Sequence, residues 1–426
     1  MRTHIKATVT KDGDMNFSQM AETPNAKRFT HCRGCIEGSL EPVLSLGDQY
    51  VVGFVKEIDL NLPRVPLNLM RCNKCGLLQL EHSTDVTIFS KEYWYRSSVN
   101  KTMRDALDDV VKTGLQYVHA GRWLDIGAND GYLLSQVPPG FTKIACEPAL
   151  NFTDKLDEIA DYVIPSCFSA ENSCLYDPKG LNLRSRGGCD VITSCAMFYD
   201  LDDPNKFVKD IATVLAPDGV WINQLNDSPT MLKANAFDAI CHEHVTYYDV
   251  HSLNAIYERN GLSIIGITYN DVNGGSIRVV AEKAVSKTRK IQLHDHRRVS
   301  ERDAELFADR TRKWKSTMTN LVTGTLSYTN KTWLYGASTK GMVMLQYLDL
   351  NEAFCGLAER NPAKFGLKMA GTWIPIRPEE EMRADRPQYV MVLPWAFKSE
   401  FVEREKSLLE DGTTMIFPLP TIEFVL

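Results

Sequence analysis

The chain has 426 residues, which is enough for about three domains at roughly 150 residues each. Hydrophobic residues make up 44% and charged residues 24%, values that exclude a disordered, collagen-like or low-complexity chain. The formal net charge of −6 gives no indication of a nucleic-acid partner or of a polybasic contact with a membrane. No apolar run approaches the ~18 residues that cross a bilayer.

Two features bear on the cellular compartment. Residues 1–14 lack the apolar core of a secretory signal. The 11 cysteines are odd in number and scattered, a pattern that is typical of reduced thiols in a large intracellular chain. We therefore expect a cytoplasmic protein that acts on a small molecule, with no nucleic-acid or membrane partner, as a monomer or a small homo-oligomer.

The first 120 residues contain three predicted regions. Residues 1–28 are polar and aperiodic, and they predict a flexible lead-in. Residues 29–80 carry two cysteine pairs and predict a small zinc-binding domain. Residues 81–120 predict a connector whose second half is helical, because apolar residues from Met103 to Leu115 recur at spacings of three and four.

Two C-x2-C pairs, separated by 36 residues, are the strongest metal signal. They are Cys32, Cys35, Cys72 and Cys75. Four thiolates on two tight turns provide a closed tetrahedral shell for Zn²⁺. Because that shell leaves no open position, the zinc is expected to be structural and to stabilise a domain with little core of its own.

The alternation of strands and helices predicts two α/β units. Strands that alternate with helices indicate a doubly wound, Rossmann-like parallel sheet, which we assign to residues 81–285. Its expected strands are Arg122–Ile126, Lys143–Glu147, Cys189–Ser194, Gly219–Asn223, Ser263–Tyr269 and Arg278–Glu282. The charged residues 286–320 predict a solvated connecting helix. A second, smaller α/β domain is expected at residues 321–426, with strands at Thr332–Tyr335, Phe354–Ala358 and Tyr389–Leu393.

A glycine-containing turn follows the first strand of the central unit. It reads D-x-G-x-x-x-G, with Asp125, Gly127, Asn129 and Gly131, and Glu147 ends the next strand 22 residues after Asp125. An acid at that point can bind ribose hydroxyls, which suits either NAD or S-adenosylmethionine. The carboxylate of Asp125 would repel a pyrophosphate but can contact an ammonium group, so the turn favours S-adenosylmethionine.

The segment Cys241-His242-Glu243-His244 is the most unusual in the chain. It follows a predicted strand, which places it near the edge of the sheet where α/β folds bind ligands. His and Glu side chains together can remove and shuttle a proton at neutral pH. We expect at least one member to be catalytic and one His to be structural. A metal site is the less favoured alternative, because the H-E-x-x-H spacing is absent.

A second turn, from Gly336 to Gly341, lies between a predicted strand and a predicted helix. Backbone N–H groups at the start of that helix, together with Lys340, can hold a diphosphate. The turn is not a Walker A loop, because the required spacing is absent. Glu359, at the end of the next strand, has the position of a ribose-binding acid. The alternative is a turn that only packs.

From about residue 30 to its end, the chain resembles the three-domain NDP-hexose C-methyltransferases. The resemblance rests on the order of the paired cysteines, the D-x-G-x-x-x-G turn, the H-E-H segment, Y-G-A-S-T-K-G and E-R-N-P-A-K-F-G. It implies a zinc-binding N-terminal domain, a central class I methyltransferase domain that uses S-adenosylmethionine, and a C-terminal α/β domain. The sugar nucleotide is expected between the last two domains, in deoxysugar or surface-polysaccharide biosynthesis.

The family motif Y-H-E-H, whose Tyr and last His serve as general base, matches Cys241-His242-Glu243-His244 here. Cys241 replaces the Tyr, and Asp200 occupies a position where the best-studied branch has a further His. These departures affect the choice of acceptor sugar or of the carbon that is attacked.

Two further motifs can be carried over. Y-x-Y-x-S-S matches Tyr93 to Ser98, so Tyr93 and Tyr95 are expected to face the active site. The family motif H-G-G-S corresponds here to Asn273-Gly274-Gly275-Ser276. Asn273 and Gly274 are expected to contact the substrate.

The resemblance implies that a base removes the C3 proton of a 4-keto sugar, and that the enolate carbon then accepts the methyl group. His244 is the expected base, with Glu243 orienting it or sharing the proton, and Tyr95, Tyr247 and Asn273 are candidate hydrogen-bonding groups. Cys241 is expected to be a small structural residue, since an unperturbed thiol is largely protonated near pH 7. Methylation of oxygen or nitrogen, and a scaffold without catalysis, remain as alternatives.

Overall fold

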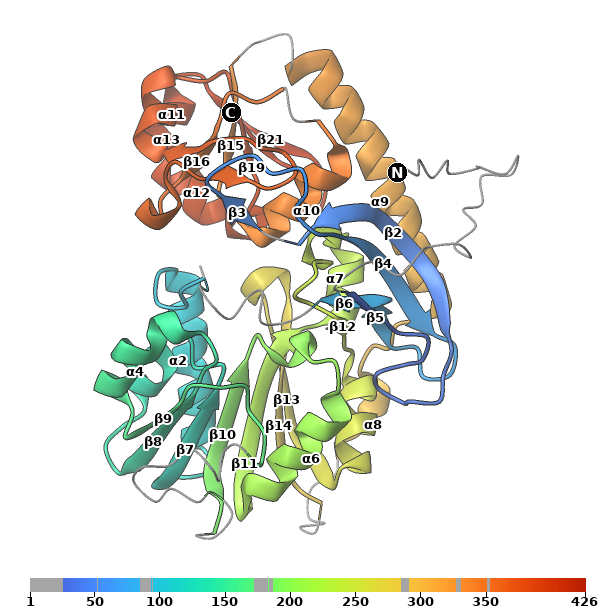
Figure 1. The fold of residues 1–426 in the computed structure, drawn as a ribbon, viewed down its shortest axis with the longest axis vertical. Helices are drawn as coiled ribbons and strands as arrows, with labels where there is room; N and C mark the ends of the chain where they lie inside the picture. The colour runs from blue at the N-terminus through green and yellow to red at the C-terminus, as the bar shows by residue number, and fades with distance from the viewer. Residues whose placement is uncertain are drawn as a thin grey trace.

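The computed structural model describes residues 26–51, 53–84, 93, 95–171, 183, 187–284, 291–326, 331–350 and 353–426. Residues 1–25 of the expected lead-in and Trp94 lie outside these ranges. A small antiparallel sheet lies at one side of the molecule, a large sheet lies below it in the view of Figure 1, and a third sheet lies above.

The N-terminal part forms a four-stranded antiparallel sheet in the order β12-β5-β4-β2. Its strands are β2 (Leu40–Tyr50), β4 (Arg64–Cys72), β5 (Leu78–Leu80) and β12 (Thr246–Tyr247). Since β12 comes from far along the chain, the sheet joins two distant segments. Beside it, β1 (Ala26–Arg28) pairs with β6 (His82–Thr84), so residues 26–28 are a strand and not a flexible lead-in. This three-residue strand, with two basic side chains, is held by ladder hydrogen bonds, which leave no apolar pattern in the sequence.

The central sheet has seven strands in the order β13-β14-β11-β10-β7-β8-β9. The strands are β7 (Gly121–Ile126), β8 (Phe141–Cys146), β9 (Tyr162–Ile164), β10 (Cys189–Cys195), β11 (Leu215–Asn226), β13 (Leu262–Asn270) and β14 (Ser276–Lys283). All neighbouring pairs are parallel except those of β14, which runs antiparallel to both β11 and β13. The predicted doubly wound sheet is therefore confirmed. The strand order reverses between β7 and β10, the point where open α/β sheets bind ligands.

Helices cover both faces of this sheet (Figure 1). One group consists of α2 (Lys101–Leu115), α3 (Tyr132–Gln136) and α4 (Thr153–Ile159), which share one hydrophobic cluster. The other group, α6 (Pro204–Val214) and α8 (Val250–Arg259), contributes to a second cluster. A further short helix, α7 (Ser228–Lys233), follows β11. Side-chain caps begin several of these helices; the Asn100 side chain, for example, accepts the backbone N–H of Thr102 at the start of α2.

The C-terminal sheet has six strands in the order β18-β16-β15-β19-β20-β21. They are β15 (Thr332–Tyr335), β16 (Leu357–Glu359), β18 (Ile376–Pro378), β19 (Tyr389–Val392), β20 (Thr414–Phe417) and β21 (Glu423–Val425). Only β21 is antiparallel to its neighbour. The accompanying helices are α10 (Thr339–Leu348), α11 (Glu379–Asp385), α12 (Lys398–Arg404) and α13 (Lys406–Glu410). Renumbered along the chain, the order 3-2-1-4-5-6 is that of a Rossmann fold. A short ladder between β3 (Phe54–Val55) and β17 (Lys368–Met369) joins this unit to the N-terminal part.

The connecting helix differs from the sequence expectation in its start and in its burial. Helix α9 (Glu301–Leu321) begins where Ser300 and Asp303 form a capping box, and not at residue 286. One of its faces is buried, with Ala304, Phe307, Ala308, Thr311, Trp314 and Met318 at helical spacing. The indole N–H of Trp314 donates to the Pro418 carbonyl at 2.7 Å. The helix is therefore a packing element between the N-terminal and C-terminal parts, and its exposed charges conceal this in the sequence.

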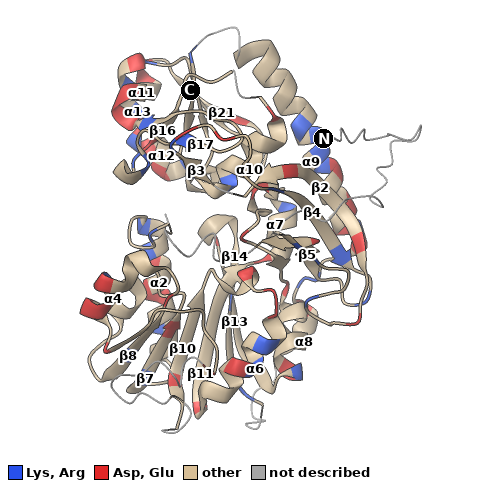
Figure 2. Ribbon diagram, viewed as in Figure 1, with Lys and Arg blue, Asp and Glu red and all other residues tan. Residues whose placement is uncertain are grey.

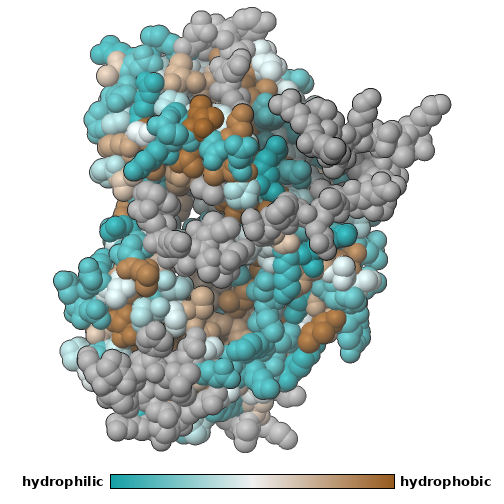
Figure 3. All heavy atoms as spheres, viewed as in Figure 1, coloured by the Kyte–Doolittle hydropathy of each residue, from teal (hydrophilic) through white to brown (hydrophobic). Residues whose placement is uncertain are grey.

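Figures 2 and 3 show where the charged and the hydrophobic residues lie in the described part of the chain. Lys, Arg, Asp and Glu lie mostly on helices and loops and seldom on the central strands (Figure 2). On the visible face the described residues are mostly hydrophilic, with hydrophobic atoms in small separate groups (Figure 3). Among the described helices, none combines the length and the apolarity that crossing a bilayer requires.

Candidate active site

The two cysteine pairs meet beside the four-stranded sheet. The sulfurs of Cys32 and Cys75 lie 3.6 Å apart, as do those of Cys35 and Cys72, and all four lie within 4.8 Å of one another. Tetrahedral thiolates at the usual Zn–S length of about 2.3 Å would be about 3.8 Å apart. Backbone N–H groups also point at the sulfurs, for example Cys75 N–H at Cys72 Sγ, 3.4 Å. The cluster fits a structural Zn²⁺ ion.

The first cysteine turn is docked against the central sheet's helices. The Asn205 side chain in α6 donates to the carbonyls of Arg33 and Gly34 at 3.0 and 2.9 Å. Arg259 at the end of α8 donates to the Gly34 carbonyl at 2.7 Å. The zinc-binding turn is therefore a part of the interface with the central unit.

The glycine turn after β7 has the conformation that a closely approaching ligand requires. Gly127, Asn129 and Gly131 have φ values of 73°, 51° and 78°, in the left-handed region. At Gly131 an added Cβ would lie 2.8 Å from Ile159 Cδ1, so glycine also permits the close approach of α4. The Asn129 side chain accepts the backbone N–H of Ser97 at 3.0 Å, which ties the turn to the segment after Tyr95.

Glu147 lies one residue beyond the end of β8 and faces the glycine turn. Its two carboxylate oxygens accept the backbone N–H groups of Asn129 and Ala149, each at 2.8 Å. Burial raises the pKa of Glu147, and these two hydrogen bonds oppose the rise. Each oxygen keeps a lone pair for a ligand hydroxyl, as a ribose-binding acid requires.

Asp125 is buried at the end of β7, with 3% of its surface exposed. Its Oδ1 accepts the Thr193 hydroxyl at 2.7 Å. Burial raises the pKa of Asp125 to about 7, and the charge of Glu147 adds to the rise. A bound cationic group would stabilise the ionised carboxylate, which agrees with the expected contact to an ammonium group.

The segment that contains the two histidines is held by the zinc-binding part of the chain. Strand β12 pairs with β5, and Leu80 N–H donates to the Val245 carbonyl at 2.9 Å. His242 Nε2 lies 2.9 Å from the Val65 carbonyl and so carries the proton of that hydrogen bond. Burial lowers the pKa of His242 to about 4. The side chain of His242 therefore points away from the sheet edge and into the packing against β4.

His244 points in a different direction from His242. Its Nδ1 lies 3.1 Å from the Ala239 carbonyl, so Nδ1 carries the proton and the Nε2 lone pair stays available. Its ring packs against Tyr199, with centroids 4.3 Å apart. Burial, together with the charge of Lys340, lowers the pKa of His244 to about 3, so the imidazole is neutral.

Glu243 lies between the two histidines in the chain and faces the C-terminal unit. Burial raises the pKa of Glu243 to about 7, and the nearby Thr339 hydroxyl at the start of α10 opposes the rise. Cys241 is 2% exposed, and burial raises the pKa of its thiol well above the usual value. The Cys241 thiol is therefore protonated at neutral pH.

The predicted tyrosines lie at two depths. Tyr93 is partly buried and interacts electrostatically with Glu243, Asp200 and Tyr199; burial raises the pKa of Tyr93 well above its usual value. Tyr95 exposes 45% of its surface, and its carbonyl accepts the Asn129 side chain at 3.1 Å. Tyr93 therefore lies with the histidine segment, and the backbone of Tyr95 lies against the glycine turn.

The turn after β15 repeats the design of the turn after β7. Gly336 has a φ of 89°, and the Ala337 N–H donates to Glu359 Oε2 at 2.9 Å. The other oxygen, Oε1, accepts the N–H of Asn361 at 2.9 Å.

Lys340 reaches across to the central unit, where its Nζ donates to the Asn273 carbonyl at 3.1 Å. Gly274 packs beside Trp395, since a Cβ there would lie 3.1 Å from the indole.

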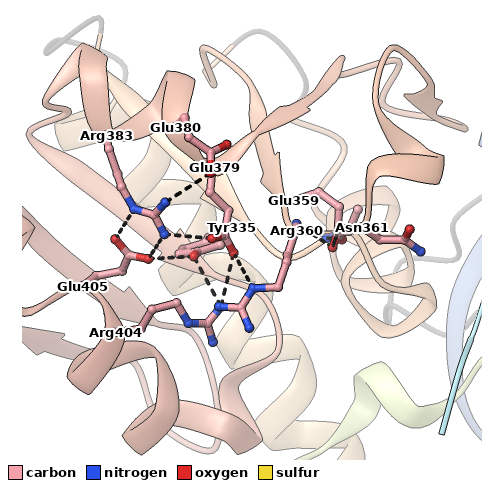
Figure 4. A network of polar contacts seen from close by, with 10 residues as sticks. Tyr335, Glu359, Arg360, Asn361, Glu379, Glu380, Arg383, Arg404 and Glu405 are labelled. Atoms are coloured by element: carbon pink, nitrogen blue, oxygen red, sulfur yellow. Dashed lines mark hydrogen bonds and ion pairs between the residues drawn. The ribbon is translucent and has the colours of Figure 1, made fainter. Parts of the chain in front are cut away.

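Sequence reasoning missed two groups of buried polar residues. Asp238 is fully buried and accepts the Trp395 indole N–H at 2.8 Å, which joins the central and C-terminal units behind the histidine segment. Tyr335 donates its hydroxyl to Glu405 at 2.8 Å within a network of Glu379, Arg383 and Arg404 (Figure 4). Glu379 and Arg383 lie four residues apart on α11, but the Asp238–Trp395 and Tyr335–Glu405 pairs join separate elements, so no sequence spacing marks them.

Three family models match consecutive parts of the chain. They are described as "Putative zinc binding domain" (residues 32–89), "Methyltransferase domain" (residues 95–266) and "C-methyltransferase C-terminal domain" (residues 271–420). The C-methyltransferase NovU of Streptomyces niveus is 28% identical over 374 residues, which cover 83% of this chain and 86% of that protein.

Solved structures that match part of this chain include the mitomycin 7-O-methyltransferase MmcR (18% identity, 43% of this chain and 54% of that chain, TM-score 0.34). Another is the CurJ carbon methyltransferase (15% identity, 47% of this chain and 58% of that chain, TM-score 0.33). Overlaps this loose support no functional conclusion.

The sheet, the glycine turn and the family models define a methyltransferase that uses S-adenosylmethionine. In its cysteine cluster and its C-terminal unit, the chain is similar to C-methyltransferases that carry a zinc-binding N-terminal domain.

Removal of the zinc should affect the histidine segment, because β5 and β12 share one sheet. We expect Cys35→Ser to reduce the metal content from about one zinc per chain, to lower the melting temperature and to reduce turnover at least tenfold. Binding of the methyl donor, measured by calorimetry, should change much less, since its turn lies in the central unit. Cys355→Ser, in the C-terminal unit, is the matched control and should keep its zinc.

Asp125 should make binding of the methyl donor depend on pH. Binding of a cation beside a carboxyl of pKa about 7 releases a proton, so affinity should rise with pH and fall by up to about tenfold per pH unit below pH 7. Asp125→Asn should bind more weakly at pH 8 and lose this dependence. Equal pH dependence in the two proteins would show that Asp125 does not contact the cation.

Proposed function

We propose that this enzyme transfers a methyl group to a ring carbon of an NDP-4-keto-deoxyhexose, in deoxysugar or surface-polysaccharide biosynthesis. The observation that carries the proposal is the position of Glu243 and His244. Both groups can accept a proton and both are partly buried: Glu243 faces Thr339 at the start of α10, and His244 packs against Tyr199 of the central unit. The relative NovU is a C-methyltransferase, which also supports attack by carbon.

Attack by carbon requires a carbanion-like nucleophile. A keto group at C4 makes the C3 hydrogen acidic, since the resulting enolate spreads its charge onto oxygen. A positioned base typically contributes 10²–10⁴-fold to such a step. S-adenosylmethionine supplies an electrophilic methyl group when it is bound. Holding both substrates in one cleft contributes at best roughly 7–11 kcal/mol to lowering the barrier.

The pKa values favour Glu243 over His244 as the base. A base with a pKa of about 7 is ionised in part at neutral pH and still binds the abstracted proton well. The pKa of about 3 for His244 makes its imidazole a poorer final acceptor. We therefore assign the C3 proton to Glu243, and we assign a hydrogen-bonding or relaying role to His244 Nε2.

The C-terminal unit provides groups that suit the nucleotide. Glu359 faces the turn at Gly336 as Glu147 faces the turn at Gly127, which suits a ribose hydroxyl. The N-terminal end of α10 carries a partial positive charge, and Lys340 adds a full one. We therefore assign the diphosphate and the ribose to this turn. We assign Tyr93 and Asn273 to contacts with the sugar.

The test uses a methyl donor labelled with ¹³C in the methyl group and a panel of NDP-4-keto-6-deoxyhexoses. A product whose ¹³C signal is that of a carbon-bound methyl supports the proposal. An oxygen- or nitrogen-bound methyl signal would favour an O- or N-methyltransferase, which needs only a base beside a hydroxyl or an amine. Donor binding without transfer to any acceptor would favour a scaffold.

Glu243→Gln should lower kcat/KM by about 10²–10⁴-fold, because the amide cannot accept the proton. In the wild-type enzyme, kcat/KM should rise with pH through about 7 as Glu243 ionises. Glu258→Gln, an exposed change on α8, is the matched control and should match the wild type. Activity that survives in Glu243→Gln and is lost in His244→Ala would transfer the role of base to His244.

A further inference from the structure

Asp200 lies beside the proposed base and has no structural partner for its buried oxygen. It ends a short turn, Phe198–Asp200, that follows β10 at the edge of the sheet where ligands bind. Its Oδ1 atom is inaccessible to water and has no hydrogen-bond partner among the described residues. Buried polar atoms in native proteins nearly always have a partner, so an unpartnered oxygen beside the proposed base points to a functional role for Asp200.

No cation among the residues that the structure describes contributes to the electrostatic environment of Asp200. Among the described residues its electrostatic neighbours are Glu243, Tyr93, Tyr199, Cys241, Tyr247 and Tyr248. By contrast, Asp202, two residues further on, lies 3.5 Å from the Arg33 guanidinium and accepts the Ser83 hydroxyl at 3.0 Å. In the described part of the chain, the ionised form of Asp202 has partners, whereas the Oδ1 atom of Asp200 has none.

Asp200 and Glu243 are both partly buried and interact electrostatically. Two such carboxyl groups cannot both ionise readily, so the pair holds one proton over a wide pH range. Glu243 is the better place for the negative charge, because the Thr339 hydroxyl and the N-terminal end of α10 lie beside it. Burial and the Glu243 charge raise the pKa of Asp200 well above its usual value. The proton of the pair therefore belongs to Asp200.

We infer that Asp200 is a neutral carboxylic acid in the working enzyme, and that its O–H donates a hydrogen bond to the substrate oxygen on which the enolate charge develops. This inference rests on the proposed function, since it requires an acceptor that forms an enolate. A carboxylic acid kept neutral in an apolar site is an effective donor to such an oxygen.

The proton balance of the reaction is complete with these two groups. The C3–H bond breaks and its proton passes to Glu243, while the charge moves onto the carbonyl oxygen and is stabilised by the Asp200 O–H. The new C–CH3 bond forms as the methyl–sulfur bond breaks, and the carbonyl is restored. Asp200 keeps its proton throughout, and Glu243 releases the abstracted proton to solvent.

The test compares Asp200→Asn, which keeps an N–H donor but cannot ionise, with Asp200→Ala, which has no donor. Loss of one donor to an oxyanion typically costs about 10²–10³ in kcat. Asp200→Ala should show this loss, whereas Asp200→Asn should stay within about tenfold of the wild type. The wild type should lose activity at alkaline pH as Asp200 ionises, and Asp200→Asn should not. Asp202→Asn is the matched control and should keep the alkaline decline.

An infrared spectrum of the protein without substrate gives a readout independent of turnover. At pH 8 the difference spectrum of the wild type minus Asp200→Asn should show the band of one protonated carboxyl. A missing band in the difference spectrum would overturn the inference even if C-methylation is found. The band without turnover of any ketosugar would leave Asp200 protonated and would overturn only its role in the reaction. An Asp200→Asn variant as inactive as Asp200→Ala, or a fully active Asp200→Ala, would overturn the donor role.

Discussion

The backbone of residues 241–247 is fixed by hydrogen bonds to parts of the chain that lie far away in sequence. Strand β12 is the edge of the zinc-binding sheet, the Val245 N–H donates to the Tyr199 carbonyl at 2.9 Å, and His242 donates to the Val65 carbonyl. These bonds turn His242 into the packing, and they leave Glu243 facing the start of α10 and His244 packed against Tyr199. The zinc cluster thereby has a role in the active site although it leaves no position for a substrate, because it stabilises the sheet to which β12 belongs.

Desolvation sets the pKa values of the acids and bases in the candidate active site more than charge pairing does. Burial is the main cause of the raised pKa of Asp125, Asp200 and Glu243 and of the lowered pKa of His244. The result is a set of acids and bases that stay neutral or titrate near pH 7, as proton transfer at neutral pH requires. A charged substrate should therefore shift the pKa values of these groups strongly, because few fixed counter-ions compete with its charge.

The features that the sequence predicts well are those encoded by local spacing. The alternation of strands and helices, the C-x2-C pairs and the positive-φ turns at Gly127 and Gly336 each depend on residues close together in the chain. Contacts between distant elements were not predictable in the same way. The pairing of β12 with β5, the burial of one face of α9 and the Asp238–Trp395 hydrogen bond join segments whose spacing carries no signal. The H-E-H motif itself does not indicate which His is structural, since only the Val65 and Ala239 carbonyls distinguish the two.

The central claim is that this buried segment removes a proton from carbon, and hydrogen exchange measures that step alone. The acceptor ketosugar is incubated with the enzyme in D₂O without the methyl donor, and loss of the C3 proton signal is followed by NMR. The account predicts enzyme-dependent exchange at C3 that is at least 10²-fold slower in Glu243→Gln. An acceptor that is methylated on carbon by the complete system, yet shows the same exchange rate with Glu243→Gln as with the wild type, would contradict it.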